Sequence, residues 1–175
     1  TGDGVVIVWD DDGTFETPGQ TATFDATGLT APAVYTIRVQ ATSVTTGLTA
    51  EDDALVYILY PFDGFFPPID NPPTFNVVNA GRAIPVKFSL GGDRGLDIFA
   101  EGYPQITFIA CDTGAPQDSV EETLTAGNSQ LTYNPVTDTY TFAWKTNKSW
   151  RNTCVELSIQ LNDGSTHIAL FRFLP

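Results

Sequence analysis

The sequence predicts an all-β protein built from antiparallel β-sandwiches, and three observations predict this class. No segment keeps a helical period of apolar residues over several turns. Runs rich in Val, Ile, Thr, Tyr and Phe alternate instead with turns of Gly, Asp, Asn and Pro. Several of these runs also alternate apolar and polar residues, as a strand does when one face is buried and the other is in water.

Short strands are expected in two groups, one before residue 61 and one after residue 73. The first group comprises 4–9, 20–25, 33–41 and 52–60. The second group comprises 74–79, 83–90, 105–111, 129–133, 138–145, 153–161 and 166–174. Short strands at this density are typical of sandwiches and barrels.

Alternation is clearest in two of these strands. In 33–41 the core face would carry Tyr35, Ile37, Val39 and Ala41, and in 83–90 it would carry Ile84, Val86, Phe88 and Leu90. In the second of these strands Pro85 cannot donate to a sheet ladder, so it marks a sheet edge or a bulge. Lys87 on the outer face of such an edge would discourage pairing with other chains.

Three other runs, 5–9, 55–60 and 168–171, are apolar on both faces. We expect their second face to be buried between domains or against another chain. Val5, Ile7 and Trp9 are the candidate interface residues of the first run.

A proline-rich connector, 61–73, separates domains expected at 1–60 and 74–175. Its five prolines predict a stiff, extended segment. Its large apolar side chains are not expected to lie bare in water. They would either pack against a domain, fixing the angle between the domains, or dock on a neighbouring chain; these side chains are Phe62, Phe65, Phe66 and Ile69.

The charge is strongly acidic and unevenly spread. The net charge is −13, which disfavours nucleic acid and anionic membrane surfaces as partners. Residues 1–60 carry nine acidic residues against one basic residue, whereas 74–175 carry ten against seven. No run approaches the roughly 18 apolar residues of a membrane-spanning helix, so we expect no insertion into a membrane.

Two cysteines, Cys111 and Cys154, have a spacing that fits no zinc motif, and one histidine cannot complete such a site. We expect one structural disulfide; a redox or metal pair is the alternative. A disulfide indicates an oxidising compartment, and hence an extracellular or cell-surface location.

The first 60 residues resemble the later part of a polycystic kidney disease (PKD) domain, an immunoglobulin-like sandwich of surface proteins. The matching stretches are Trp9-Asp10, Asp12 to Thr17, Pro18 to Phe24 and Tyr35 to Val39. The family's Trp-Asp-x-Gly-Asp-Gly turn is altered here to Trp-Asp-Asp-Asp-Gly. The likeness starts at the family's middle strands, so it implies a partial domain.

Residues 74–175 resemble the bacterial PxKF domain, whose motif is seen here as Pro85-Val86-Lys87-Phe88. Further matches are 77–84, 89–96, 140–146 and the Cys111/Cys154 pair. The resemblance implies a domain near the C-terminus of secreted bacterial proteins, with no known catalytic activity. The two likenesses together imply two immunoglobulin-like antiparallel β-sandwich domains joined by the Pro/Phe-rich connector.

Catalytic residues are not expected. The single histidine, His167, lies in an expected strand beside apolar residues, where a half-buried or surface side chain is more common than a general base. No cofactor is expected, except possible calcium at an acidic turn formed by Asp10, Asp11, Asp12 and Glu16. Close carboxylates supply several of the oxygens that calcium needs, and the alternative is a solvated turn.

Four aromatic residues raise the question of a sugar-stacking platform: Trp144, Trp150, Tyr133 and Tyr140. Alternation places Tyr140 and Trp144 in the core, whereas Trp150 follows a polar turn and is the residue expected to be exposed.

Three functions follow from these observations. The first is a non-catalytic structural or adhesive module of a bacterial cell-surface or secreted protein. The second is a self-assembling filament subunit, in which a strand from another copy completes the partial first domain. The third is a carbohydrate-binding module. The expected partners are other domains of the parent protein or other copies of the chain.

Overall fold

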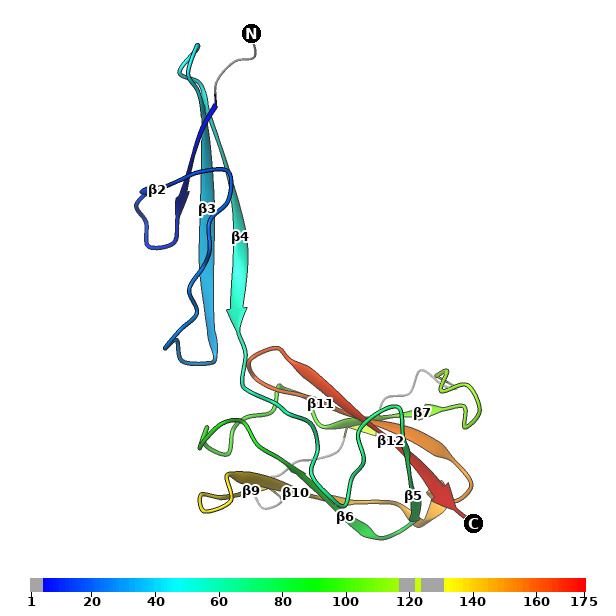
Figure 1. The fold of residues 1–175 in the computed structure, drawn as a ribbon. Coiled ribbons are helices and arrows are strands. Elements are labelled where there is room, and N and C mark those ends of the chain that lie inside the picture. Colours follow the sequence, from blue (N-terminus) through cyan, green and yellow to red (C-terminus); the bar gives the residue numbers. More distant parts are fainter. Residues whose placement is uncertain (1–4, 117–121, 124–130) are drawn as a thin grey trace. The chain divides into compact units, whose positions relative to one another are not determined.

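The structure is a computed structural model that describes residues 5–116, 122–123 and 131–175. Over these residues the chain forms strands, turns and one short 3-10 helix, η1 (Lys148–Trp150), with no α-helix. The chain divides into two compact units, residues 1–59 and 60–175, which Figure 1 shows in colours that follow the sequence. The predicted all-β class is confirmed.

The described part of the first unit forms one antiparallel sheet. Its strands are β1 (Val5–Asp10), β2 (Thr17–Pro18), β3 (Ala33–Ser43) and β4 (Thr49–Ile58), in the order β2-β1-β3-β4. The β3–β4 hairpin is long, as Figure 1 shows, and β4 is an outer strand of the sheet. The unit therefore has one sheet layer where a complete sandwich has two.

One face of this sheet is apolar because the strand register brings apolar residues opposite one another. Tyr35 lies opposite Val56, and Ile37 lies opposite Ala54. Phe24 packs against Tyr35 on this face, with 5.5 Å between the ring centroids. The segment around Phe24 thus covers part of the face without adding a second sheet.

The prediction of a strand at 20–25 is wrong. On its outer side β1 pairs with β2 instead, where Thr17 lies opposite Trp9, and 21–26 is irregular. Gly19 N makes a last bond to Ile7 O at 2.9 Å, and the chain turns away at Gly19, whose φ is +134°. The apolar residue of this segment, Phe24, packs on the sheet face rather than at its edge.

The second unit is a two-layer sandwich. One layer has the order β6-β10-β9, formed by β6 (Ala83–Phe88), β9 (Leu131–Asn134) and β10 (Thr139–Lys145). The other has the order β5-β12-β11-β7-β8, formed by β5 (Phe75–Asn79), β7 (Gln105–Ile109), β8 (Glu122–Thr123), β11 (Cys154–Gln160) and β12 (Thr166–Leu174). The pair β5–β12 is parallel, and the other pairs are antiparallel.

The core of this sandwich is aromatic. Alternation along β10 turns Tyr140, Phe142 and Trp144 inward, and each is at most 1% exposed. Trp144 meets Phe171 of the opposite layer edge to face, with 4.9 Å between the ring centroids. Full burial of each large apolar side chain contributes about 1.5–3 kcal/mol to stability, so this layer contact is a principal source of the unit's stability.

Pro85 lies in an edge strand, because β6 is the outer strand of its layer. The backbone N–H of Phe66 donates to Lys87 O at 2.8 Å, so the peptide groups of Lys87 face away from β10. Pro85, two residues earlier, has the same orientation. Its missing N–H therefore falls on the side where no strand needs a donor.

The connector lies on the second unit. Phe65 and Ile69 are 4% and 2% exposed, and Phe66 is half-buried. Asn71 holds Phe65 from both sides: its Oδ1 accepts from Phe65 N at 2.7 Å and its Nδ2 donates to Phe65 O at 3.0 Å. This proline-rich segment is therefore part of the packed unit rather than a separate spacer.

Cys111 and Cys154 form the predicted disulfide. Cys154 lies opposite Ile109 in the β7–β11 ladder, so the bond joins neighbouring strands of one layer. It closes the chain between residues 43 positions apart and does not tie the two layers together.

Candidate functional site

The acidic turn that follows β1 is built around Asp10. This side chain is 4% exposed, and its Oδ1 accepts hydrogen bonds from the backbone N–H groups of Asp12, at 2.9 Å, and Gly13. Asp10 therefore caps the turn through that oxygen. The part expected of Asp10 as a calcium ligand stays a prediction, and it would fall to its other carboxylate oxygen.

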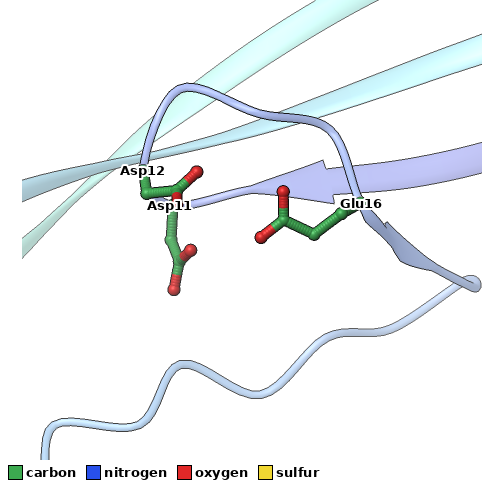
Figure 2. A group of neighbouring side chains, drawn as sticks. All are labelled: Asp11, Asp12 and Glu16. Carbon is green, nitrogen blue, oxygen red and sulfur yellow. The ribbon is translucent and has the colours of Figure 1, made fainter.

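The other three acids come together in solvent. Carboxylate oxygens of Asp11, Asp12 and Glu16 lie within 4.8 Å of one another, and all three residues are exposed. Figure 2 shows the Glu16 carboxylate directed toward the two aspartates. Partial removal from water raises the pKa of Glu16, and the negative charges of Asp12, Asp11 and Asp10 raise it further.

This arrangement can offer a cation three carboxylates from one turn. Calcium takes six to eight oxygens, so water or backbone carbonyls would have to supply the rest. Asp52 and Asp53 of β4 are not members of the cluster. Such a set has the composition of a weak, water-rich site.

His167 belongs to a hydrogen-bonded chain with Ser165 and Asp163. The Ser165 hydroxyl donates to Asp163 Oδ1 at 2.6 Å and lies 3.1 Å from His167 Nε2. Since a hydroxyl has one proton, His167 Nε2–H is the donor to Ser165. A serine nucleophile needs the reverse, with its proton passed to a histidine that the carboxylate orients. Burial lowers the pKa of His167, and the charge of Asp163 partly offsets this shift.

Asp163 and His167 also hold the start of the connector. Asp163 Oδ2 accepts from the backbone N–H of Tyr60 at 2.6 Å. The His167 ring stacks on Phe62 with 3.6 Å between the centroids and 13° between the planes. We call these two contacts the connector clamp. Sequence reasoning missed it because its partners are about a hundred positions apart, although Asn162-Asp163-Gly164-Ser165 reads as a tight turn.

Three of the four aromatic residues considered for sugar stacking are core residues. Trp144 and Tyr140 are buried as alternation predicts, and Trp150 is 6% exposed, so its expected exposure is wrong. It packs against Phe173 at 5.7 Å. Tyr133 is half-buried, and its hydroxyl donates to Asp138 at 2.9 Å. Burial, followed by this hydrogen bond and nearby acids, raises the pKa of Tyr133 to about 12.

The candidate interface residues of β1 are partly or fully accessible. Val5 is 56% exposed, and Ile7 and Trp9 are half-buried. On β4, Leu55 and Tyr57 are 52% and 56% exposed. On the face of the sheet opposite to Leu55 and Tyr57 there is a hollow. Its lining includes Trp9, Thr17, Phe24, Ile37, Ala54 and Val56. The first unit thus presents apolar side chains on both faces of its sheet.

Comparisons with known proteins give distant likenesses. No protein-family model matches the chain, and no curated protein matches it. Within the part of the chain that the structure covers, no helix has the length and apolar character needed to cross a membrane.

Three solved structures illustrate the structural likeness. Fibronectin(III)-like modules of CbhA from Clostridium thermocellum are 12% identical, with 99% of this chain and 80% of that chain covered and a TM-score of 0.35. Extracellular domains 3–5 of Drosophila OTK are 12% identical, with 97% and 50% covered and a TM-score of 0.36. Three N-terminal domains of the bacteriophage RB49 outer capsid protein Hoc are 13% identical, with 98% and 57% covered and a TM-score of 0.32.

Proposed function

We propose that this chain is a non-catalytic structural or adhesive module of a bacterial cell-surface or secreted protein. The observation that carries the proposal is the second unit, a closed, disulfide-bonded sandwich whose aromatic side chains are engaged in packing. The resemblance of 1–60 to PKD domains and of 74–175 to PxKF domains supports the same reading. The disulfide favours an oxidising, extracellular location.

Force spectroscopy on the whole chain, held at its two ends, tests a structural role directly. We expect the second unit to open in one resolved step, at a higher force than the first unit. The disulfide locks the segment between residues 43 positions apart, so reduction should lengthen the released chain by about 150 Å at roughly 3.6 Å per residue. A second unit that extends without a resolved step would contradict a structural role.

Ser165 allows a test of the proposal that the chain is not catalytic. Its hydroxyl donates a hydrogen bond to Asp163. We expect no labelling of this residue by a fluorophosphonate, a reagent that reacts with activated serines. Covalent labelling at Ser165 would show an activated hydroxyl and would contradict the proposal.

A second candidate function is self-assembly, which the apolar, single-layer first unit favours. Burial of Leu55 and Tyr57 by a strand from another copy would contribute about 1.5–3 kcal/mol per side chain. The outer strand β4 leaves one edge unpaired within the described sheet, and such an edge accepts an added strand.

Analytical ultracentrifugation and negative-stain microscopy test this assembly. At about 500 mM NaCl, where charge contacts are screened, we expect the mass to rise with concentration and Leu55→Lys/Tyr57→Lys to prevent the rise. The matched control is Val136→Lys, since Val136 is 91% exposed in the second unit, and it should behave as the unaltered chain. An unaltered chain that stays monomeric, or a double variant that assembles as before, would remove this function.

A further inference from the structure

Five of the eight basic residues of the chain lie at one end of the second unit. They stand where β10 ends, β6 begins, β11 begins and β12 ends, and they are Arg82, Lys145, Lys148, Arg151 and Arg172. We call this surface the basic end. All five residues are exposed, and no ion pair to any of them is found over the residues the structure describes.

A rigid frame holds the first of these residues. Lys145 lies opposite Ala83 in the β6–β10 ladder. Just beyond it, the Thr146 hydroxyl donates to Arg82 O at 2.7 Å and accepts from Gly81 N at 2.9 Å. Thr146 itself is only 9% exposed. The backbone that carries Arg82 and Lys145 is therefore fixed by buried hydrogen bonds rather than left to a loose loop.

Lys148 and Arg151 flank the buried Trp150 on either side of η1. The Lys148 stem lies so close over Gly81 that a Cβ there would come within 2.4 Å of Lys148 Cγ. Gly81 also has φ +81°, so both its backbone and the Lys148 contact require glycine. The position of Lys148 at the basic end is thus fixed by packing.

Arg172 completes the surface from the neighbouring layer. It lies opposite Cys154 on one side and Val77 on the other. One described acid, Asp112, follows the bonded Cys111 at this end. The balance of charge here remains positive in a chain whose net charge is −13.

The opposite end of the same sandwich is acidic. It carries Asp93, Asp97, Glu101, Asp138 and Asp163, around the β9–β10 and β11–β12 turns. Its one base, Arg94, donates to the backbone carbonyls of Leu90 and Gly91. Charge in the second unit is therefore separated from one end to the other.

The first unit offers a surface that complements the basic end. Glu51, Asp52 and Asp53 are consecutive and exposed on the outer strand β4; we call them the acidic edge. Arg38, the one base of the first unit, lies opposite Asp53, which leaves the edge net negative. Like charges prevent two such edges from pairing with each other, so this half of β4 fits a basic surface instead.

We infer that the basic end of one copy docks on the acidic edge of a second copy of this chain. Charge complementarity between two surfaces of the same sequence is the ground for choosing a second copy as the occupant. The contact is head-to-tail, so its repetition builds either a closed ring or an open-ended row of molecules. The inference rests on the second candidate function, self-assembly, and names a contact distinct from the apolar strand pairing.

The contact between the basic end and the acidic edge is expected to be weak. Pairs between exposed charges are individually weak and are screened by salt, with a screening length of about 10 Å at 0.1 M. The acidic surroundings also repel other copies at a distance. We therefore expect this contact to add to association at low salt and to contribute nothing at high salt.

Sedimentation velocity measures this association on the whole chain. At about 20 mM NaCl the average mass should rise above the monomer mass of 18.9 kDa more steeply with concentration than at about 500 mM, where charge contacts are screened and only strand pairing remains. Lys148→Glu/Arg151→Glu and Asp52→Lys/Asp53→Lys should each abolish this salt-dependent part of the rise. An equimolar mixture of the two variants should restore it. The intact acidic edge of one variant then meets the intact basic end of the other, and the two reversed surfaces also attract each other.

Matched controls separate this contact from general charge effects and from strand pairing. Asp97→Lys/Glu101→Lys changes the net charge as much as Asp52→Lys/Asp53→Lys does, at the other end of the second unit, and should associate as the unaltered chain. Leu55→Lys/Tyr57→Lys tests strand pairing by itself. Circular dichroism should show that each variant keeps its strands.

Three results would overturn the inference. One is an unaltered chain that stays monomeric at low salt. Another is a salt-dependent rise in mass that survives both charge reversals. The third is a chain that stays monomeric while its basic end binds a soluble polyanion such as heparin, which would make a polyanion the partner of this surface.

Discussion

At the scale of single residues, the positions of largest consequence are polar side chains that the fold has buried. Asp163 is 9% exposed and serves three donors, namely Tyr60 N, Ser165 N and the Ser165 hydroxyl. Asp10 plays a similar part in the first unit, where it caps its own turn. Both residues act through backbone groups that would otherwise lack a partner.

Asp163→Ala should destabilise the second unit by about 2–4 kcal/mol, because a buried donor without a partner costs about 1–3 kcal/mol. Asp163→Asn, which keeps an acceptor, should cost less. Denaturant unfolding in a Trp9→Phe background measures the effect, since the remaining tryptophans, Trp144 and Trp150, report on the second unit. Asp97→Ala, at an exposed site, is the control and should change stability by less than about 0.5 kcal/mol.

The acidic turn gives a second prediction at this scale. Three exposed carboxylates within 4.8 Å should bind calcium weakly, with dissociation constants of about 10⁻⁴–10⁻³ M, as extracellular modules do. Calorimetric titration measures the binding, and Glu16→Gln should remove it. No saturable heat, with an unchanged melting temperature in chelator, would show a solvated turn instead.

Sequence reasoning at the residue scale succeeded where local pattern decides the outcome. Alternation alone placed Tyr140 and Trp144 in the core, and cysteine count and spacing pointed to the disulfide. Trp150 was misjudged because its neighbours in sequence are polar, whereas its burial comes from Phe108 and Phe173. The capping role of Asp10 was not foreseen, because composition does not reveal which of three consecutive acids turns inward.

At the scale of elements, the connector packs on the second unit, which is one of the two outcomes that its large apolar side chains predict. Phe65 and Ile69 are buried, and the N–H of Phe66 donates to the edge strand β6. Phe62 and Tyr60 are held by the clamp residues of the β11–β12 hairpin. Contacts between positions about a hundred apart carry no local signal, so the clamp could not be predicted from periodicity. The irregular path of 20–25 could not be predicted either, because it depends on Phe24 packing on the face of the sheet.

The clamp should respond to pH through His167. Burial lowers the pKa of His167, so the folded state binds fewer protons than the unfolded state. Its contribution to stability is therefore present above the unfolded pKa of about 6.5 and is lost as pH falls through the lower folded value. His167→Phe keeps an aromatic ring beside Phe62 and removes this titration.

Unfolding free energies at about pH 7.5 and about pH 5 test this prediction. The unaltered chain should lose more stability between the two than His167→Phe does. The pKa of Asp138 is lowered chiefly by a hydrogen bond from Ser89. Asp138 therefore also makes the unfolding free energy fall as pH falls, but it does so equally in both proteins and cancels in the comparison. Equal slopes would show that His167 does not contribute.

At the scale of the whole molecule, the two units differ in completeness. The second has two layers, an aromatic core and a disulfide, whereas the described first unit has one sheet with apolar residues on both faces. This difference predicts that the second unit is stable by itself. It also favours the proposal that association with another copy stabilises the first unit.

The disulfide should stabilise the second unit selectively. Its partners are 43 positions apart, and a loop of this size is worth about 4 kcal/mol in the chain-entropy model. Cys111→Ala/Cys154→Ala should lower the unfolding free energy of the second unit by about this amount and leave the first unit unchanged. Thermal unfolding followed by tryptophan fluorescence, with and without Trp9→Phe, separates the two units.

Hydrogen exchange with mass spectrometry, over a range of protein concentrations, tests whether the second unit is complete and the first unit open. We predict that β10 and β11 are strongly protected at every concentration. We also predict that β4 exchanges much faster in dilute solution and gains protection as concentration rises. Protection of β4 equal to that of β10 in dilute solution, unchanged on concentration, would show that the first unit is closed without a partner.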